Sequence, residues 1–179
     1  MNKWILILCF LFLIGCDENK KYNIVFEKGL DAYKNKDYEI AFNIFQDLSD
    51  KGYSKAQFEL GFMYADGYGV KKDTSKAFEL IEKSALQGYS EAQFHLALEY
   101  YLGTIIVNNY KDYQKASEWF EKSATQGNTK AQYNLGRMYE DGEGVRQDYK
   151  KAKELFGKAC DGGYESGCYN YSELNKTGY

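Results

Sequence analysis

Hydrophobic and small residues recur at helical spacing in four stretches of the chain. Counting from an alanine, positions +3, +4, +7 and +8 are apolar or small, which places them in one stripe on a helix of about 3.6 residues per turn. The four stretches begin at Ala41, Ala77, Ala116 and Ala152. The chain contains no proline, so nothing interrupts a series of helices. The pattern predicts four amphipathic helices, which we call the B helices.

Each predicted B helix is bounded by residues that suit helix ends. An aspartate stands four residues before each alanine, where its carboxylate can accept hydrogen bonds from the free backbone N–H groups of the first turn. These aspartates are Asp37, Asp73, Asp112 and Asp148. A glycine follows each helix and favours a left-handed helix stop. These glycines are Gly52, Gly88, Gly127 and Gly163.

A second kind of helix, the A helix, precedes the last three B helices. Alanine, leucine, glycine and tyrosine stand at its positions 0, +4, +5 and +8, as in Ala56, Leu60, Gly61 and Tyr64. At about 100° per residue these positions share one arc of the helix surface. The small alanine and glycine are expected to let the B helix approach closely.

A glycine-containing corner is predicted to join each A helix to its B helix. The corner is GYGV at 67–70 and GEGV at 142–145. The middle copy loses the second glycine and gains three residues, so we expect a longer, reshaped corner there.

The A and B helices form a repeated unit. Complete copies start at Ala56, Ala92 and Ala131, which are 36 and 39 residues apart, and a degenerate copy opens at Gly167. A fixed period in this range indicates stacked helical units that bury their apolar faces only against their neighbours. We expect residues 24–179 to form one all-α solenoid. Its parts are a cap at 24–55, repeats at 56–91, 92–130 and 131–166, and a truncated cap at 167–179.

The motif A-x-x-x-L-G-x-x-Y-x-x-G-x-G-V-x-x-D, followed by K-A and K-[SA]-[AC]-x-x-G, resembles the Sel-one-like repeat, a relative of the tetratricopeptide repeat. The resemblance covers Ala56 to the C-terminus, and the cap looks like a plain tetratricopeptide unit. It implies a right-handed superhelix of antiparallel helix pairs. It also implies a concave binding surface that serves as an adaptor between proteins.

Two cysteines, Cys160 and Cys168, lie in the last units. In a stacked solenoid they sit at the end of one helix and the start of the next, so we expect a disulfide, with two buried free thiols as the alternative. The C-x7-C pair is also similar to the cysteine-rich Sel-one-like proteins of Helicobacter and its relatives. Some of those are described as weak β-lactam-binding or β-lactamase proteins, which gives an alternative function.

Catalytic chemistry finds little support in the residues. A serine enzyme of the penicillin-binding kind needs S-x-x-K and K-T-G around one pocket, and only Lys176-Thr177-Gly178 is present. His95 is the only histidine, whereas a catalytic zinc site needs several ligands of that kind. We therefore assign no catalytic residue, metal ligand or cofactor, and leave open whether the chain is an enzyme.

The remaining surface of the A helices is the candidate for partner binding. Positions +2, +3 and +6 fall opposite the core arc and are partly aromatic or aliphatic, the composition of a groove for a peptide or a partner helix. They are Phe58, Glu59, Phe62, Phe94, His95, Leu98, Tyr133, Asn134 and Arg137. Alternatively, the residues at +2 and +6 pack one A helix against the next A helix, inside the solenoid. With 26 acidic and 23 basic residues and no basic stripe, the chain does not suit nucleic acid.

The N-terminus indicates export. Lys3 precedes an apolar run at 4–14, which is shorter than the ~20 residues of a membrane-spanning helix. Residues 13–16 (LIGC) resemble the lipobox of bacterial lipoproteins, in which the cysteine, here Cys16, becomes lipidated. We expect a signal peptide at 1–15 and a lipidated tether at 16–23. A plain secreted protein and an uncleaved anchor are the alternatives.

We therefore expect a lipoprotein scaffold that is held on the bilayer, faces the periplasm and binds a protein or peptide of the cell envelope. Asp17 resembles a residue that retains such proteins in the inner membrane, although the rule varies among bacteria, so the choice of membrane stays open.

Overall fold

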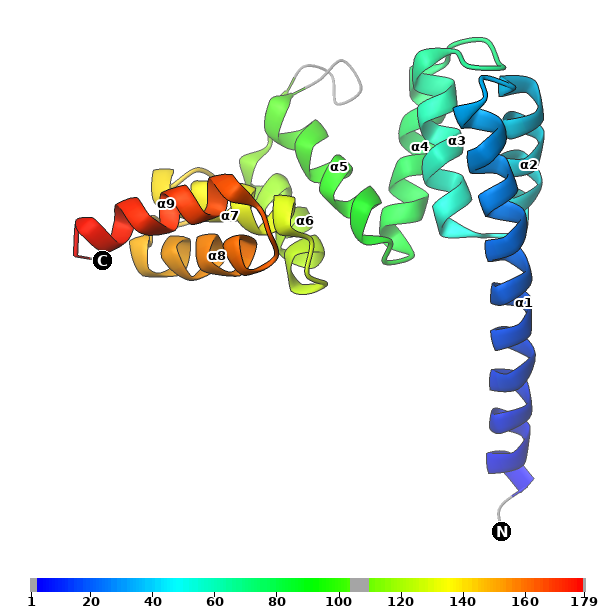
Figure 1. The fold of residues 1–179 in the computed structure, drawn as a ribbon, viewed down its shortest axis with the longest axis horizontal. Coiled ribbons are helices and arrows are strands. Elements are labelled where there is room, and N and C mark those ends of the chain that lie inside the picture. Colours follow the sequence, from blue (N-terminus) through cyan, green and yellow to red (C-terminus); the bar gives the residue numbers. More distant parts are fainter. Residues whose placement is uncertain (1–2, 104–109, 179) are drawn as a thin grey trace. The chain divides into compact units, whose positions relative to one another are not determined.

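The computed structural model describes the backbone of residues 3–103 and 110–178, and the side chains of residues 19–103 and 110–178. Within these ranges the regular secondary structure is α-helical and no strand occurs, which confirms the all-α prediction (Figure 1). The helices are α1 (Lys3–Lys34), α2 (Tyr38–Asp50), α3 (Ser54–Asp66), α4 (Thr74–Leu86), α5 (Ser90–Leu102), α6 (Tyr113–Thr125), α7 (Thr129–Asp141), α8 (Tyr149–Asp161) and α9 (Glu165–Lys176).

The helices correspond to the predicted repeat. The A helices are α3, α5 and α7, the B helices are α2, α4, α6 and α8, and α9 is the A helix of the degenerate copy. The chain divides into two compact units, Met1–Ala77 and Phe78–Tyr179, which we describe separately. In the second unit each helix from α5 to α9 packs against the next.

The N-terminal predictions concern the least described part of the chain. The side chains of the predicted signal peptide and of Cys16 lie outside the described residues, and the backbone of the tether at 16–23 lies within α1. Among the helices that could be searched, none is long and apolar enough to cross a bilayer.

The core of the first unit lies between α1, α2 and α3. Phe45 of α2 is fully buried, and its ring centroid lies 5.5 Å from that of Phe26 on α1. A Cβ on Gly29 of α1 would come within 2.5 Å of the Phe45 ring, so glycine is needed for this approach. A buried phenylalanine contributes about 1.5–3 kcal/mol through the hydrophobic effect.

The second unit repeats this arrangement. Phe120 of α6 and Phe156 of α8 are fully buried at the same +4 position as Phe45. A Cβ on Gly136 of α7 would come within 2.8 Å of the Phe156 ring. This confirms that a small residue on the A helix admits the B helix.

The helix ends follow the predictions with one correction. The carboxylates of Asp73, Asp112 and Asp148 each accept a hydrogen bond from the backbone N–H three residues later, at 2.9–3.0 Å. Asp37 was predicted to do the same, but its side chain makes no capping bond; its backbone ψ is 61°, against 84° at Asp112 and 97° at Asp148. The glycines that follow the B helices have φ values of 83–91°, as a left-handed stop requires.

The corner glycines have two different roles. Gly67 and Gly142 end their A helices in the left-handed conformation. Gly69 and Gly144 also have positive φ, but they lie against the first residue of the preceding B helix. A Cβ on Gly69 would come within 2.5 Å of the carbonyl oxygen of Tyr38, and a Cβ on Gly144 would overlap the carbonyl of Tyr113. The predicted longer corner of the middle copy falls on residues 104–109, outside the described residues.

A recurrent contact, which we call the clasp, ties each B helix to the next A helix. The amide nitrogen of a glutamine at position +1 of the A helix donates to a backbone carbonyl near the end of the preceding B helix, eight residues earlier. The bonds are Gln57 to Ser49 (3.3 Å), Gln93 to Ala85 (3.1 Å) and Gln132 to Ala124 (3.1 Å). The clasp adds a second donor to a carbonyl at the end of the helix that already accepts the backbone N–H of the following glycine.

In the last unit a disulfide takes the place of this clasp. Cys168 stands at the glutamine position of α9, and Cys160 stands eight residues earlier on α8. Their sulfur atoms are bonded, and their Cα atoms lie 4.5 Å apart. The structure therefore pairs the two cysteines as predicted.

Candidate partner-binding surfaces

The +2 residues of the A helices belong mainly to the core. Phe58 and Phe94 are only 7% and 6% exposed. The ring of Phe94 lies 5.9 Å from that of Phe120, and the ring of Tyr133 lies 5.7 Å from that of Phe156. Each aromatic ring at +2 in the second unit therefore packs on the B helix of its own repeat. These rings belong to the core of the solenoid and not to an open groove.

The +3 residues are half-buried. Asn134 donates from its amide nitrogen to the carbonyl oxygen of Lys130 at 2.8 Å. Burial, with the positive charge of Lys130 as a second cause, lowers the pKa of His95 to about 4, so its imidazole is neutral near pH 7. Burial also raises the pKa of Glu59.

The +6 residues extend from half-buried to exposed. Phe62 packs on Phe58 with ring centroids 4.9 Å apart, and Leu98 packs partly against the core of the second unit. Arg137 is exposed and pairs with Asp141 at 3.5 Å. Leu102, four residues beyond Leu98, is 57% exposed and was not among the predicted residues. At position +10 it falls in the same arc as +3 and +6, so the period could have found it.

Two hydrogen bonds join α5 to the A helix of the next repeat and its corner. Asn128, which precedes α7, donates to Glu91 at 3.1 Å, and Tyr101 donates to Glu143 at 2.8 Å. Burial raises the pKa of Tyr101 to about 12, with this hydrogen bond as the second cause.

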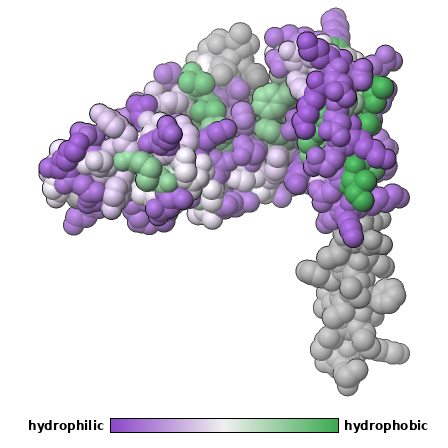
Figure 2. All heavy atoms as spheres, viewed as in Figure 1, coloured by the Kyte–Doolittle hydropathy of each residue, from purple (hydrophilic) through white to green (hydrophobic). Residues whose placement is uncertain are grey.

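We call the outward side chains of α5 and α7 the A-face. It consists of His95, Leu98, Leu102, Asn134 and Arg137. On the face drawn in Figure 2, hydrophobic residues form small separate patches among hydrophilic ones.

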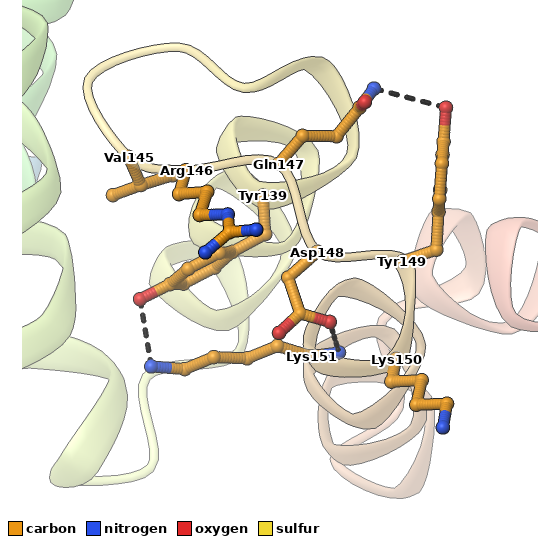
Figure 3. A pocket seen from close by; sticks show the side chains of 8 residues that line it. All are labelled: Tyr139, Val145, Arg146, Gln147, Asp148, Tyr149, Lys150 and Lys151. Atoms are coloured by element: carbon orange, nitrogen blue, oxygen red, sulfur yellow. Dashed lines mark hydrogen bonds between the residues drawn. The ribbon is translucent and has the colours of Figure 1, made fainter.

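A second candidate surface is a cavity of about 690 Å³ at the corner between α7 and α8, which we call the corner pocket (Figure 3). Its lining residues are Tyr139, Val145, Arg146, Gln147, Asp148, Tyr149, Lys150 and Lys151. Three cationic residues and one carboxylate thus contribute to the lining, and Lys150 points away from Arg146 in Figure 3. Lys151 donates to the hydroxyl of Tyr139 at 2.7 Å, and this hydrogen bond is the main cause that raises the pKa of Lys151.

One of these lysines belongs to a repeated contact. The ammonium groups of Lys76, Lys115 and Lys151 lie 4.5, 5.1 and 4.4 Å from the ring centroids of Tyr64, Tyr100 and Tyr139. Such cation–π pairs contribute about 0.5–1 kcal/mol at exposed sites. Lys151 therefore has a structural role.

Sequence reasoning missed the corner pocket. One signal was available: Lys150 and Lys151 are consecutive cations in the first turn of α8, where the helix dipole disfavours positive charge. At the position of Lys150 the earlier repeats carry Ser75 and Gln114. Lys150 thus places a cation where the earlier repeats have an uncharged residue, and helix stability does not explain this change.

Lys176, of the K-T-G tripeptide, is exposed near the end of α9 and pairs with Glu173 at 2.6 Å. Among the side chains that could be searched, no group of three or more potential ligands is placed to hold a metal ion.

Comparison with known proteins gives a family and several structural relatives. The Sel1 repeat model matches residues 54–89, 90–128 and 129–164, each beginning two residues before the alanine-based repeat. A Sel1 repeat protein from Oxalobacter formigenes is similar with a TM-score of 0.72 and 30% identity, over 76% of this chain and 39% of that chain. The protective antigen c5321 of uropathogenic Escherichia coli is similar with a TM-score of 0.74 and 30% identity, over 87% of this chain and 34% of that one.

Two further relatives differ in coverage. Cysteine rich protein B of Helicobacter pylori has a TM-score of 0.53 and 25% identity, over 69% of this chain and 94% of that chain. The DAP3-binding cell death enhancer 1 of Rattus norvegicus is 43% identical over 47 residues, which are 26% of this chain and 9% of that protein. The chain thus spans less than half of the length of several of its relatives.

These matches confirm the all-α repeat fold and the resemblance to Helicobacter cysteine-rich proteins. Sel1 repeats generally mediate protein–protein interaction. Because the three matched repeats cover more than half of its residues, the chain belongs to the Sel1 repeat family.

Proposed function

We propose that this protein is a membrane-anchored scaffold of the bacterial envelope that binds a partner protein through the A-face. The observation that carries the proposal is the exposed Leu102 beside the half-buried Leu98, with Arg137 on the A helix of the next repeat. The other support is the general role of Sel1 repeats in protein–protein interaction.

The A-face has the chemistry of a protein contact. Leu98 is held by the core and offers a fixed apolar edge, while burial of the exposed 57% of Leu102 by a partner contributes about 1–2 kcal/mol. Asn134, Arg137 and the neutral His95 supply polar groups around these leucines. An apolar centre with a polar rim is the usual composition of such interfaces.

A photo-crosslinking amino acid at Asn134 tests this proposal in the native membrane. We expect a discrete crosslinked species, and we expect Leu102→Glu to reduce its yield at least about tenfold because a buried carboxylate without a partner opposes binding. Immunoblotting against the chain measures the yield.

Leu86→Glu is the matched control, because Leu86 is 69% exposed on α4 and lies outside the A-face. It should leave the crosslink intact. Both variants should keep the helical circular dichroism signal. Equal yields from the two variants would show that the A-face does not bind the partner.

Membrane anchoring rests on the lipobox-like sequence that ends at Cys16 and on the polar segment that follows it. Two or more acyl chains hold a protein stably on a bilayer, since each buried CH2 contributes about 0.8 kcal/mol. We expect Cys16→Ala to move the protein from the membrane fraction to the soluble fraction, measured by ultracentrifugation and immunoblotting. Cys9→Ala is the control for loss of a thiol. Unchanged partitioning of the Cys16 variant would exclude lipidation.

β-Lactam binding or hydrolysis is the second candidate function. It is supported by the similarity to Helicobacter pylori cysteine rich protein B and by the Cys160–Cys168 disulfide. Hydrolysis of a chromogenic cephalosporin by the purified protein, abolished by a single substitution, would favour this function over the scaffold.

A further inference from the structure

We propose that the corner pocket binds a carboxylate from an acidic peptide segment of a protein partner. The proposal goes beyond the scaffold function because the pocket shares no residue with the A-face. It rests on the hydrogen-bonding balance and the charge of the residues in Figure 3.

The pocket offers hydrogen-bond donors that lack acceptors. Because Lys151 donates to the hydroxyl oxygen of Tyr139, the proton of that hydroxyl is left to donate elsewhere. The carboxylate of Asp148 already accepts the backbone N–H of Lys151 at 3.0 Å. A ligand that fits this balance supplies acceptor oxygens, not donors.

The charge of the pocket agrees with this balance. Arg146 and Lys150 are exposed, and neither makes an ion pair among the described residues. The acidic groups on the same corner are engaged elsewhere, since Asp141 pairs with Arg137 and Glu143 accepts from Tyr101. Asp148, the one carboxylate among the lining residues, caps α8 and makes no ion pair with Arg146 or Lys150.

The lining of the pocket suits a carboxylate that stands next to an apolar residue. Arg146 can bind both carboxylate oxygens through its guanidinium group, whereas Lys150 points away from Arg146 in Figure 3 and adds positive charge without touching the same carboxylate. The side chain of Val145 and the ring of Tyr139 give the pocket apolar surface for a residue next to the acidic one. A net charge of −3 does not prevent this, because charges beyond about 8 Å are screened at physiological salt.

Fluorescence anisotropy tests the proposal with the full chain in detergent. The probe is a fluorescein-labelled ten-residue peptide of alternating glutamate and leucine, and its partner probe carries glutamine in place of glutamate. We expect the glutamate peptide to bind at least about tenfold more tightly than the glutamine peptide. Arg146→Ala with Lys150→Ala should weaken its binding at least about tenfold, since the charge-assisted contact of Arg146 and the nearby charge of Lys150 are both lost.

Lys28→Ala with Lys83→Ala is the matched control, because it removes the same charge from exposed sites on α1 and α4. It should change the dissociation constant less than about twofold. Circular dichroism should show both double variants folded. The proposal is overturned by equal binding of the two peptides, by equal effects of the two double variants, or by no peptide binding.

Two other results would also overturn it. In the first, the protein binds phosphatidylglycerol vesicles but not the peptide, and the binding to vesicles depends on Arg146 and Lys150. The other is displacement of the peptide by inorganic phosphate at equal molar concentration. Neither would affect the scaffold proposal, which the Leu102→Glu crosslinking result decides.

Discussion

Gly144→Ala is expected to lower the free energy of unfolding of the second unit by about 3 kcal/mol. Gly144 has φ of 69°, and a Cβ there would overlap the backbone carbonyl of Tyr113. The carbonyl cannot rotate away without disturbing the first turn of α6. The corner must therefore lift off α6, and the packing between the two repeats is lost with it. Urea denaturation followed by circular dichroism at 222 nm measures the change.

The control for this substitution is Gly127→Ala. Gly127 also has a positive φ, of 89°, but a Cβ there would meet nothing within 4 Å. Its replacement should therefore cost only the strain of the left-handed backbone, about 1 kcal/mol. If the two variants lose the same stability, the close approach between corner and helix has no energetic importance.

Loss of the disulfide is expected to destabilise the last repeat by about 2.5 kcal/mol, the value for so small a loop on the chain-entropy model. The variant is Cys160→Ala with Cys168→Ala, compared with the oxidised parent protein by urea denaturation. The extensive contacts of α9 are with a single helix, α8. The loss of stability should therefore appear first as unfolding of α9. Thiol labelling of the unreduced parent should detect neither Cys160 nor Cys168.

The chain itself supplies a matched control for this loss. Cys160→Ala with Cys168→Gln gives the last repeat the residues that form the clasp at Gln93 and Gln132. This variant should be about 1 kcal/mol more stable than the double alanine variant, the usual net contribution of a hydrogen bond. Equal stability of the two variants would mean that a glutamine there forms no clasp.

The helical period predicted the fold because each repeat reuses it. The spacing alone identified the alanine four residues before each of Phe45, Phe120 and Phe156, and also the glycine that stops each B helix. The clasp was not, although glutamine recurs at 57, 93 and 132, because a period places a side chain on an arc without naming the carbonyl that it reaches. Asp37 has the same spacing as the other three aspartates but makes no capping bond, so the spacing alone does not establish a cap.

The binding surfaces were only partly predictable for the same reason. The arc that contains +2, +3 and +6 was identified, but Phe94 turns toward Phe120, whereas Arg137 remains exposed. Which half of an arc is covered depends on the crossing of neighbouring helices. The corner pocket depends on how the chain from Val145 to Lys151 folds over Tyr139, and no periodic pattern contains that path.

The contact between Gly144 and Tyr113 makes the corner of one repeat depend on a helix of the repeat before it. Each such corner needs a finished helix from the repeat before it, and so does the corner at Gly69, which lies on Tyr38. Polypeptides are made and exported from the N-terminus, so the receiving helix is always synthesised before the corner that docks on it. Assembly can therefore proceed repeat by repeat behind the ribosome or the export channel, with every new segment arriving at a template that already exists.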